Sequence, residues 1–200
     1  GDLLPRDFVA RLCEECPGMV MVDEAYIEFA GEGASVQDLL ARFPNLVVLR
    51  TLSKAFGCAG IRCGYVIAAP EVIDVFAAVR QIYSVNVLTQ ATALAAVRAR
   101  DAFAPVVAKV VSERERVLAA LKGMAADGLS VRVWPSRANF LLVRVPEASR
   151  VRRALRDGYS ILVRDFSATP GLEDCLRITI GTPQENDEVL AALAALLKRG

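Results

Sequence analysis

Three short, continuous apolar runs constrain the fold of this chain more than any other feature. They cover residues 19–22, 46–49 and 64–68. Runs of this kind are typical of strands that are buried on both faces, as in parallel sheets. Amphipathic helix patterns precede the first run and separate it from the second. The alternation predicts an α/β architecture, with a mostly parallel sheet and flanking helices.

The rest of the chain divides into helical and strand patterns. Helices are expected at residues 5–16, 36–43, 71–80, 88–98, 102–121, 147–156 and 184–198, and further strands at 131–133, 140–145, 161–163 and 176–180. After Asp127-Gly128 the pattern changes from long helices to mixed strands and helices. This change predicts a large domain over residues 1–126 and a small α+β domain over 127–200. The charged side of the long helix is expected to be a solvated face; it comprises Lys109, Glu113, Arg114, Glu115 and Arg116.

The composition excludes several classes of function. There is no histidine, so Ser-His-Asp catalysis, Cys-His catalysis and histidine-ligated metals are excluded within this chain. Five cysteines favour a reduced, cytoplasmic protein, and the lone pair Cys13 and Cys16 is no zinc site, so no metal is expected. With a net charge of +1 and no apolar span, neither a nucleic acid nor a membrane is an expected partner.

Candidate functional residues follow the apolar runs. Asp23 ends the first run and Tyr26 follows it, Ser53 and Lys54 follow the second, and Arg62 lies beyond a glycine-rich turn. In α/β folds ligands bind at the carboxyl ends of the strands. If neighbouring strands pair in parallel, these five side chains converge on one crevice.

That set of side chains matches the needs of pyridoxal phosphate. This cofactor requires a lysine amine for a Schiff base, a carboxylate at its pyridine nitrogen, a donor at its phenolic oxygen, and cationic and hydroxyl groups at its phosphate. Lys54 can supply the amine and Asp23 the carboxylate. Tyr26 can supply the donor at the phenolic oxygen. The phosphate can be held by Arg62 and Ser53. Each residue alone also has an ordinary structural explanation, such as an aspartate that caps a turn, and the residues by themselves leave both interpretations open.

Longer motifs add a resemblance to a known family. The segments are 22–26 (VDEAY), 51–65 (TLSKAFGCAGIRCGY), 135–141 (PSRANFL), 161–166 (ILVRDF) and 175–183 (CLRITIGTP). In this order they resemble the fold-type I aminotransferases, and most closely the histidinol-phosphate aminotransferases. The resemblance covers essentially the whole chain. It implies a partial pyridoxal-phosphate transferase large domain, followed by the small C-terminal domain.

The resemblance also implies a reaction and residue roles. The reaction is amino transfer between histidinol phosphate and 2-oxoglutarate, with glutamate as the partner amino acid, in histidine biosynthesis. Lys54 would bind the cofactor and shuttle a proton, while Asp23, Tyr26, Ser53 and Arg62 would hold the cofactor. Arg177 and Arg164 match arginines that bind the acidic end of the substrate. The family is homodimeric, with a tyrosine contributed across the interface.

Alternatives remain within and outside this class. Another acidic-substrate aminotransferase, a threonine-phosphate decarboxylase and a non-catalytic aminotransferase-like domain all share these motifs. The chain is expected to begin at the glycine of the family's Asn-Pro-x-Gly turn, partway through the large domain. The first strand would then have an unpaired apolar edge, and the isolated 200-residue chain is expected to be inactive.

Overall fold

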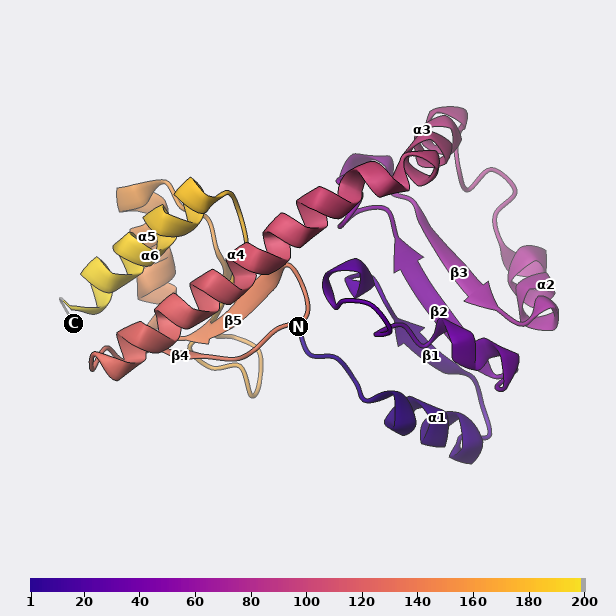
Figure 1. Ribbon diagram of the computed structural model, residues 1–200, viewed down its shortest axis with the longest axis horizontal. Coiled ribbons are helices and arrows are strands. Elements are labelled where there is room, and N and C mark those ends of the chain that lie inside the picture. Colours follow the sequence, from indigo (N-terminus) through magenta and orange to yellow (C-terminus); the bar gives the residue numbers. More distant parts are fainter. Residues whose placement is uncertain (199–200) are drawn as a thin grey trace. The chain divides into compact units, whose positions relative to one another are not determined.

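Two separate sheets, one in each half of the chain, organise the structure (Figure 1). The computed structural model describes residues 1–198. The N-terminal unit is Leu3–Val107, and the C-terminal unit runs from Ala108 onward and includes Gly1–Asp2. Each unit has its own hydrophobic core. Among the described residues, no helix is long and apolar enough to cross a membrane.

The N-terminal unit contains a three-stranded sheet in the order β1 (Val20–Asp23), β2 (Leu46–Thr51) and β3 (Gly64–Ala68). All three predicted strands are confirmed. β1 and β2 are parallel, as expected, but β3 is antiparallel to β2. The expectation of parallel pairing is wrong there because the connection contains only a short 3-10 turn, η3 (Ala59–Ile61), and no crossover helix. The Leu52 amide donates to the Cys63 carbonyl at 3.1 Å, which closes this reversal.

One face of this sheet is covered by α1 (Arg6–Glu15). Val9 and Cys13 of the helix pack against Leu46 and Val48 of β2. On the uncovered side, β1 lies at the end of the described sheet and Met21 is 55% exposed. The predicted apolar edge is therefore present at β1.

The remaining elements of this unit are short helices. They are η1 (Ile27–Phe29), η2 (Gln37–Ala41), α2 (Pro70–Val79) and α3 (Val87–Arg98), followed by the first turns of α4 (Arg100–Ala126). The full helix expected at residues 36–43 is wrong, since only the 3-10 turn η2 forms there.

The C-terminal unit contains an antiparallel sheet in the order β4 (Arg132–Val133), β5 (Phe140–Arg144), β7 (Cys175–Thr179) and β6 (Arg164–Asp165). Its core joins this sheet to α5 (Ala148–Tyr159), α6 (Pro183–Leu197) and the later turns of α4 (Arg100–Ala126). The strand expected at residues 161–163 is wrong. Ser160 adopts a left-handed conformation with φ 57°, and the Ile161 amide bonds back to the Leu155 carbonyl, so these residues end α5 before β6 begins.

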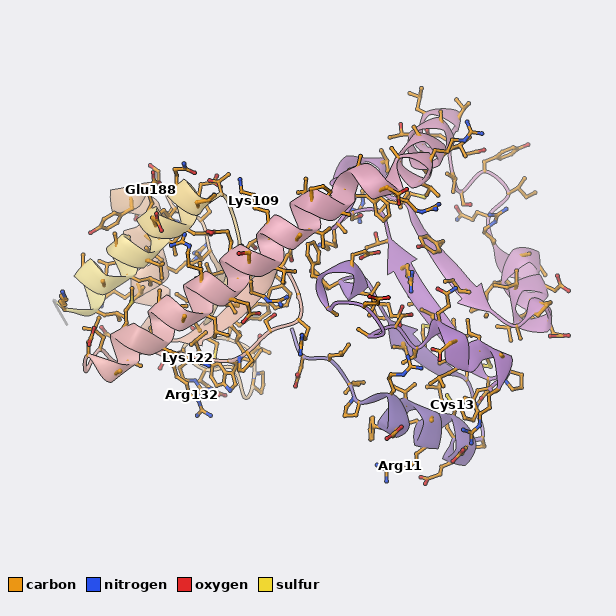
Figure 2. All side chains as sticks on the ribbon, viewed as in Figure 1. Arg11, Cys13, Lys109, Lys122, Arg132 and Glu188 are labelled. Carbon is orange, nitrogen blue, oxygen red and sulfur yellow. The ribbon has the colours of Figure 1, made fainter. Side chains whose placement is uncertain are left out.

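The expected solvated face of α4 is also wrong at two positions. Arg114 is 2% exposed, and the side chain of Glu113 is only 12% exposed. Arg114 lies three, four and seven residues before Val117, Leu118 and Leu121, which places it on the buried stripe of the helix. Other cations of α4, such as Lys109 and Lys122, extend into solvent (Figure 2). The domain boundary at 126/127 stays a prediction, although α4 already supplies core residues to the C-terminal unit.

Candidate active site

The predicted cofactor residues of the N-terminal unit lie at one edge of its sheet. Asp23 ends β1, and Ser53 and Lys54 follow β2; because these strands are parallel, their carboxyl ends share an edge. β3 begins at that same edge, where Gly64 pairs with Thr51. Arg62 precedes β3 by two residues, so the antiparallel direction of β3 brings it to this edge.

Lys54 and Tyr26 are in direct contact. The Lys54 Nζ atom lies 5.3 Å from the centre of the Tyr26 ring. Lys54 is exposed, and among the described residues its amine has no hydrogen-bond or ion-pair partner. An exposed amine beside a phenol ring is available to bind a carbonyl group covalently.

Local hydrogen bonds fix the two strand ends. The Asp23 Oδ1 atom accepts from the Ala25 amide at 2.9 Å, which makes an Asx turn and leaves the carboxylate exposed. After β2, the Ser53 amide donates to the Thr51 hydroxyl at 3.1 Å, and this hydroxyl donates to the Cys63 carbonyl at 3.2 Å. The side chain of Thr51 thus ties the turn that carries Ser53 and Lys54 to the start of β3.

Arg62 adopts a left-handed backbone conformation, with φ 52° and ψ 46°. For a residue other than glycine this conformation costs about 1–2 kcal/mol, and such strain is concentrated at functional sites. The turn is held by Thr89, which is buried in α3 and donates from its hydroxyl to the Ile61 carbonyl at 3.1 Å. Thr89 was not among the sequence candidates. The sequence feature that could have pointed to Thr89 is Asn86 three residues earlier. Asn86 is the N-cap of α3, and its side chain accepts a hydrogen bond from the Thr89 amide at 2.9 Å.

The donor set at this edge fits pyridoxal phosphate. It offers an amine without a partner, an exposed carboxylate, a phenol and a cation beside a hydroxyl-bearing turn. Within the described residues 1–198, the Arg62 guanidinium makes one hydrogen bond, from Nη1 to the Ala59 carbonyl at 3.1 Å, which leaves donors for a phosphate. Residues 1–198 contain no group of three acidic or cysteine side chains that would hold a metal ion.

The two predicted substrate arginines lie in the C-terminal unit, on adjacent strands. Arg164 of β6 is directly opposite Arg177 of β7. The Arg177 Cζ atom lies 5.0 Å from the Phe140 ring centre and 5.8 Å from that of Phe166, and the Arg164 Cζ atom lies 5.9 Å from the Phe166 ring centre. The Arg177 Nε atom is buried and has no hydrogen-bond partner among residues 1–198.

Two like charges opposite each other destabilise a sheet. An anion with several acceptor oxygens would offset this repulsion and would satisfy the donors of Arg177. Phe140 and Phe166 lie within cation–π distance of its guanidinium. The arrangement is therefore suited to a carboxylate or phosphate. The two rings were not among the sequence candidates, although both lie within quoted motifs.

Asp165, between Arg164 and Phe166, has a lowered pKa because it accepts hydrogen bonds from Ser149 and Ser167. A lowered pKa means that Asp165 stabilises the fold above the pKa of an unfolded aspartate, 3.8, and that this contribution is lost as the pH falls through the lower folded value. We expect Asp165→Asn to have a lower free energy of unfolding than the parent at pH 7. The difference between their free energies of unfolding should become smaller below about pH 4. Urea unfolding followed by the fluorescence of Trp134, the single tryptophan, measures this. A difference that stays constant with pH would contradict it.

Comparison with known proteins agrees with this geometry. A family model described as aminotransferase class I and II matches residues 1–193. The chain belongs to this aminotransferase family. The aminotransferase chain is 43% identical over 197 residues to histidinol-phosphate aminotransferase of Roseiflexus castenholzii, and 44% identical over 204 residues to that of Aeromonas hydrophila. These alignments cover 96% and 98% of this chain, and 51% and 55% of the relatives.

Solved structures give the same result for the fold. The histidinol-phosphate aminotransferase of Sinorhizobium meliloti, in complex with pyridoxal 5'-phosphate, matches with a TM-score of 0.86 and 27% identity, over 100% of this chain and 54% of that one. L-threonine-O-3-phosphate decarboxylase of Porphyromonas gingivalis matches with a TM-score of 0.87 and 28% identity, over 99% of this chain and 61% of that one. This aminotransferase chain spans about half the length of the curated relatives it matches.

Proposed function

We propose that the natural protein carrying this chain is a pyridoxal-phosphate-dependent aminotransferase that acts on histidinol phosphate and 2-oxoglutarate. The observation that carries the proposal is the unpartnered amine of Lys54, which lies over the Tyr26 ring at the edge where Asp23 ends β1. The relatives named histidinol-phosphate aminotransferase, at 38–44% identity, support this choice of substrate.

In this proposal each residue at the edge has one task. When bound, pyridoxal phosphate supplies an aldehyde that captures amines and a ring that withdraws electrons from the substrate. Lys54 would hold the cofactor through Nζ; the substrate amine would displace this nitrogen, and the freed amine would then accept the proton that leaves the substrate carbon. Asp23 stabilises positive charge at the ring nitrogen, and Tyr26 donates to the ring oxygen.

The charged ends of the ligands require cationic groups. Ser53 and Arg62 hold the cofactor phosphate in this proposal. Arg177, with Arg164 opposite it, binds the phosphate of histidinol phosphate or a carboxylate of 2-oxoglutarate. A guanidinium forms two parallel hydrogen bonds with either anion, which allows one group to serve two substrates in turn.

The test is a panel of substrates offered to the natural protein with added cofactor. Histidinol phosphate with 2-oxoglutarate should be converted faster than aspartate, phenylalanine or other donors, with glutamate as product. A preference for another donor would overturn the substrate, and no transfer with any donor would overturn the activity. The same assay on the isolated 200-residue chain tests the expectation that it is inactive.

A second candidate is decarboxylation of threonine phosphate. The similarity to the Porphyromonas decarboxylase favours it, and the opposed arginines suit its phosphate equally well. Release of carbon dioxide from threonine phosphate, without a need for 2-oxoglutarate, would identify this reaction. Binding of the cofactor without either reaction would favour a non-catalytic domain.

We also propose that the protein is a cytoplasmic homodimer. All five cysteines are free, which suits a reduced compartment. Strongly exposed apolar side chains gather between α2 and α3, the kind of surface that a subunit interface covers; they include Val79, Ile82, Tyr83, Val87 and Leu88.

A further inference from the structure

Glu24, which directly follows Asp23, is a buried carboxylate with four hydrogen bonds. It is 5% exposed. Its Oε1 atom accepts from the Val36 amide at 2.7 Å. Its Oε2 atom accepts from the Ser35 hydroxyl at 2.9 Å and from Nε and Nη2 of Arg50 at 3.0 and 2.9 Å. A buried charge is tolerated when it is paired and hydrogen-bonded to this extent.

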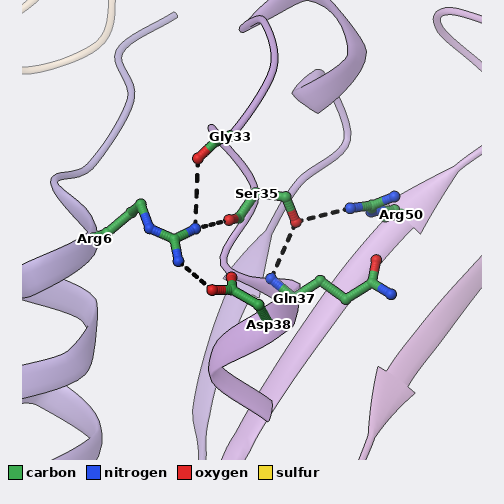
Figure 3. A pocket seen from close by; sticks show the side chains of 6 residues that line it. All are labelled: Arg6, Gly33, Ser35, Gln37, Asp38 and Arg50. Carbon is green, nitrogen blue, oxygen red and sulfur yellow. Dashed lines mark hydrogen bonds and ion pairs between the residues drawn. The ribbon is translucent and has the colours of Figure 1, made fainter. Parts of the chain in front are cut away.

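These bonds join three segments of the N-terminal unit. Glu24 directly follows β1, Ser35 lies in the loop before η2, and Arg50 lies near the end of β2, four residues before Lys54. Arg50 closes the triangle, since its Nη2 atom also donates to the Ser35 hydroxyl at 2.8 Å (Figure 3). We call Glu24, Ser35 and Arg50 the clamp.

The clamp borders a surface pocket of about 470 Å³, lined by Arg6, Gly33, Ser35, Gln37, Asp38 and Arg50 (Figure 3). The two arginines of this pocket are already neutralised, Arg50 by Glu24 and Arg6 by Asp38 at 2.5 Å. Their pairing argues against an anion site in the pocket and for a structural task of the cations.

The position of the clamp in the sheet indicates what that task is. Side chains alternate between the faces of a strand, so Arg50 lies on the same face as Val48, which packs against α1, and Leu49 lies on the other. Asp23 pairs with Leu49, and the Glu24 amide donates to the Leu49 carbonyl at 2.8 Å. Glu24 is thus fixed on the α1 side, and this holds the preceding Asp23 on the opposite face.

We propose that the clamp of Glu24, Ser35 and Arg50 positions the cofactor-binding edge, by locking the ends of β1 and β2 that carry Asp23, Tyr26 and Lys54. The clamp residues are positioning residues, since their side-chain bonds are to one another, to the loop and to Tyr65, and not to those three side chains. The inference rests on the proposed function, because it assigns the edge a cofactor to hold.

The test compares Glu24→Gln with a core variant of the same strands. Glu24→Gln keeps one oxygen for Val36 but replaces the other with a donor that faces Arg50. Val48→Ala, two residues before Arg50 on the same face, loosens the core without touching the clamp. For the natural protein, the dissociation constant for pyridoxal phosphate and the Tm without cofactor are measured for each variant.

We expect Glu24→Gln to weaken cofactor binding on the order of tenfold, the lower end of what removal of a partner behind a ligand costs in metal sites. Val48→Ala should change the dissociation constant for pyridoxal phosphate less than about threefold, although its loss of Tm is comparable to that of Glu24→Gln. Equal losses of affinity in the two variants would show a merely structural role and overturn the proposal. If Glu24→Gln does not fold, Arg50→Lys replaces it, because lysine keeps the charge but cannot bridge Glu24 and Ser35 as a fork.

Amide exchange of the cofactor-free protein separates this inference from the proposed function. Glu24→Gln should raise exchange selectively in residues 23–26 and 52–56, whereas Val48→Ala should not. If the parent protein binds no pyridoxal phosphate, the proposed function fails and the exchange pattern alone decides whether the clamp orders this edge. Unchanged exchange in both segments would overturn the clamp.

Discussion

Lys54→Ala is expected to abolish covalent retention of pyridoxal phosphate and to lower kcat of the natural protein by at least about 1,000-fold. The variant removes both the nitrogen that attaches the cofactor and the base that moves the substrate proton. Lys54 is the only lysine in the sequence of the N-terminal unit, since the remaining three lysines of the chain, Lys109, Lys122 and Lys198, belong to the C-terminal unit. The fold should be unaffected, because Lys54 is exposed and, within residues 1–198, its side chain has no hydrogen-bond or ion-pair partner and contacts the Tyr26 ring.

Retention is measured by desalting the protein, recording its visible absorbance, and locating the cofactor by mass spectrometry after borohydride reduction. Lys122→Ala, an exposed lysine of α4, is the matched control and should behave as the parent. Lys54→Arg tests whether the positive charge alone is sufficient. Arginine keeps a cation near Tyr26, but it stays protonated and so cannot replace the amine of Lys54. Cofactor that remains attached at another residue in Lys54→Ala would contradict the assignment.

Arg114→Met is expected to destabilise the C-terminal unit by about 2–4 kcal/mol. The Arg114 Nη1 atom donates to the Ala138 carbonyl at 3.0 Å, and Nε and Nη2 bind Glu115 at 3.0 and 2.9 Å. The first of these bonds joins α4 to the segment that leads into β5. Methionine fills much of the volume but leaves the carbonyl buried without a donor, which accounts for most of the expected cost.

Urea unfolding monitored by Trp134 fluorescence measures this change, because the single tryptophan lies in the C-terminal unit. Lys122→Met on the same helix is the control and should stay within about 0.5 kcal/mol of the parent. An effect of Arg114→Met as small as that of the control would mean that the buried bond to Ala138 contributes nothing.

The three strands of the N-terminal unit and their ends were predictable because their signal is local. A continuous apolar run followed by Asp23 or by Ser53 and Lys54 identifies a buried strand and the polar residues beyond it. The direction of β3 was not predictable from its own residues, because the hydrogen bond between Leu52 and Cys63 that reverses the chain joins positions 11 residues apart.

The misread positions share a different cause. Charge favoured a solvated Arg114, yet helical spacing placed it on the stripe of Val117 and Leu121, and the spacing decided its burial. No sequence pattern singles out Glu24, which simply follows Asp23 after the first apolar run. Its partners Val36 and Arg50 lie 12 and 26 residues away, so the clamp depends on tertiary contacts that no local pattern reveals.

The residues proposed for the cofactor and the arginines proposed for the substrate stand on units with separate hydrophobic cores. Substitutions that share no contacts contribute additively to stability. During divergence of such a family, the surroundings of Arg164 and Arg177 can therefore accumulate substitutions without weakening the scaffold of Lys54. Inherited cofactor chemistry and a changing preference for anions can then evolve at different rates within one gene.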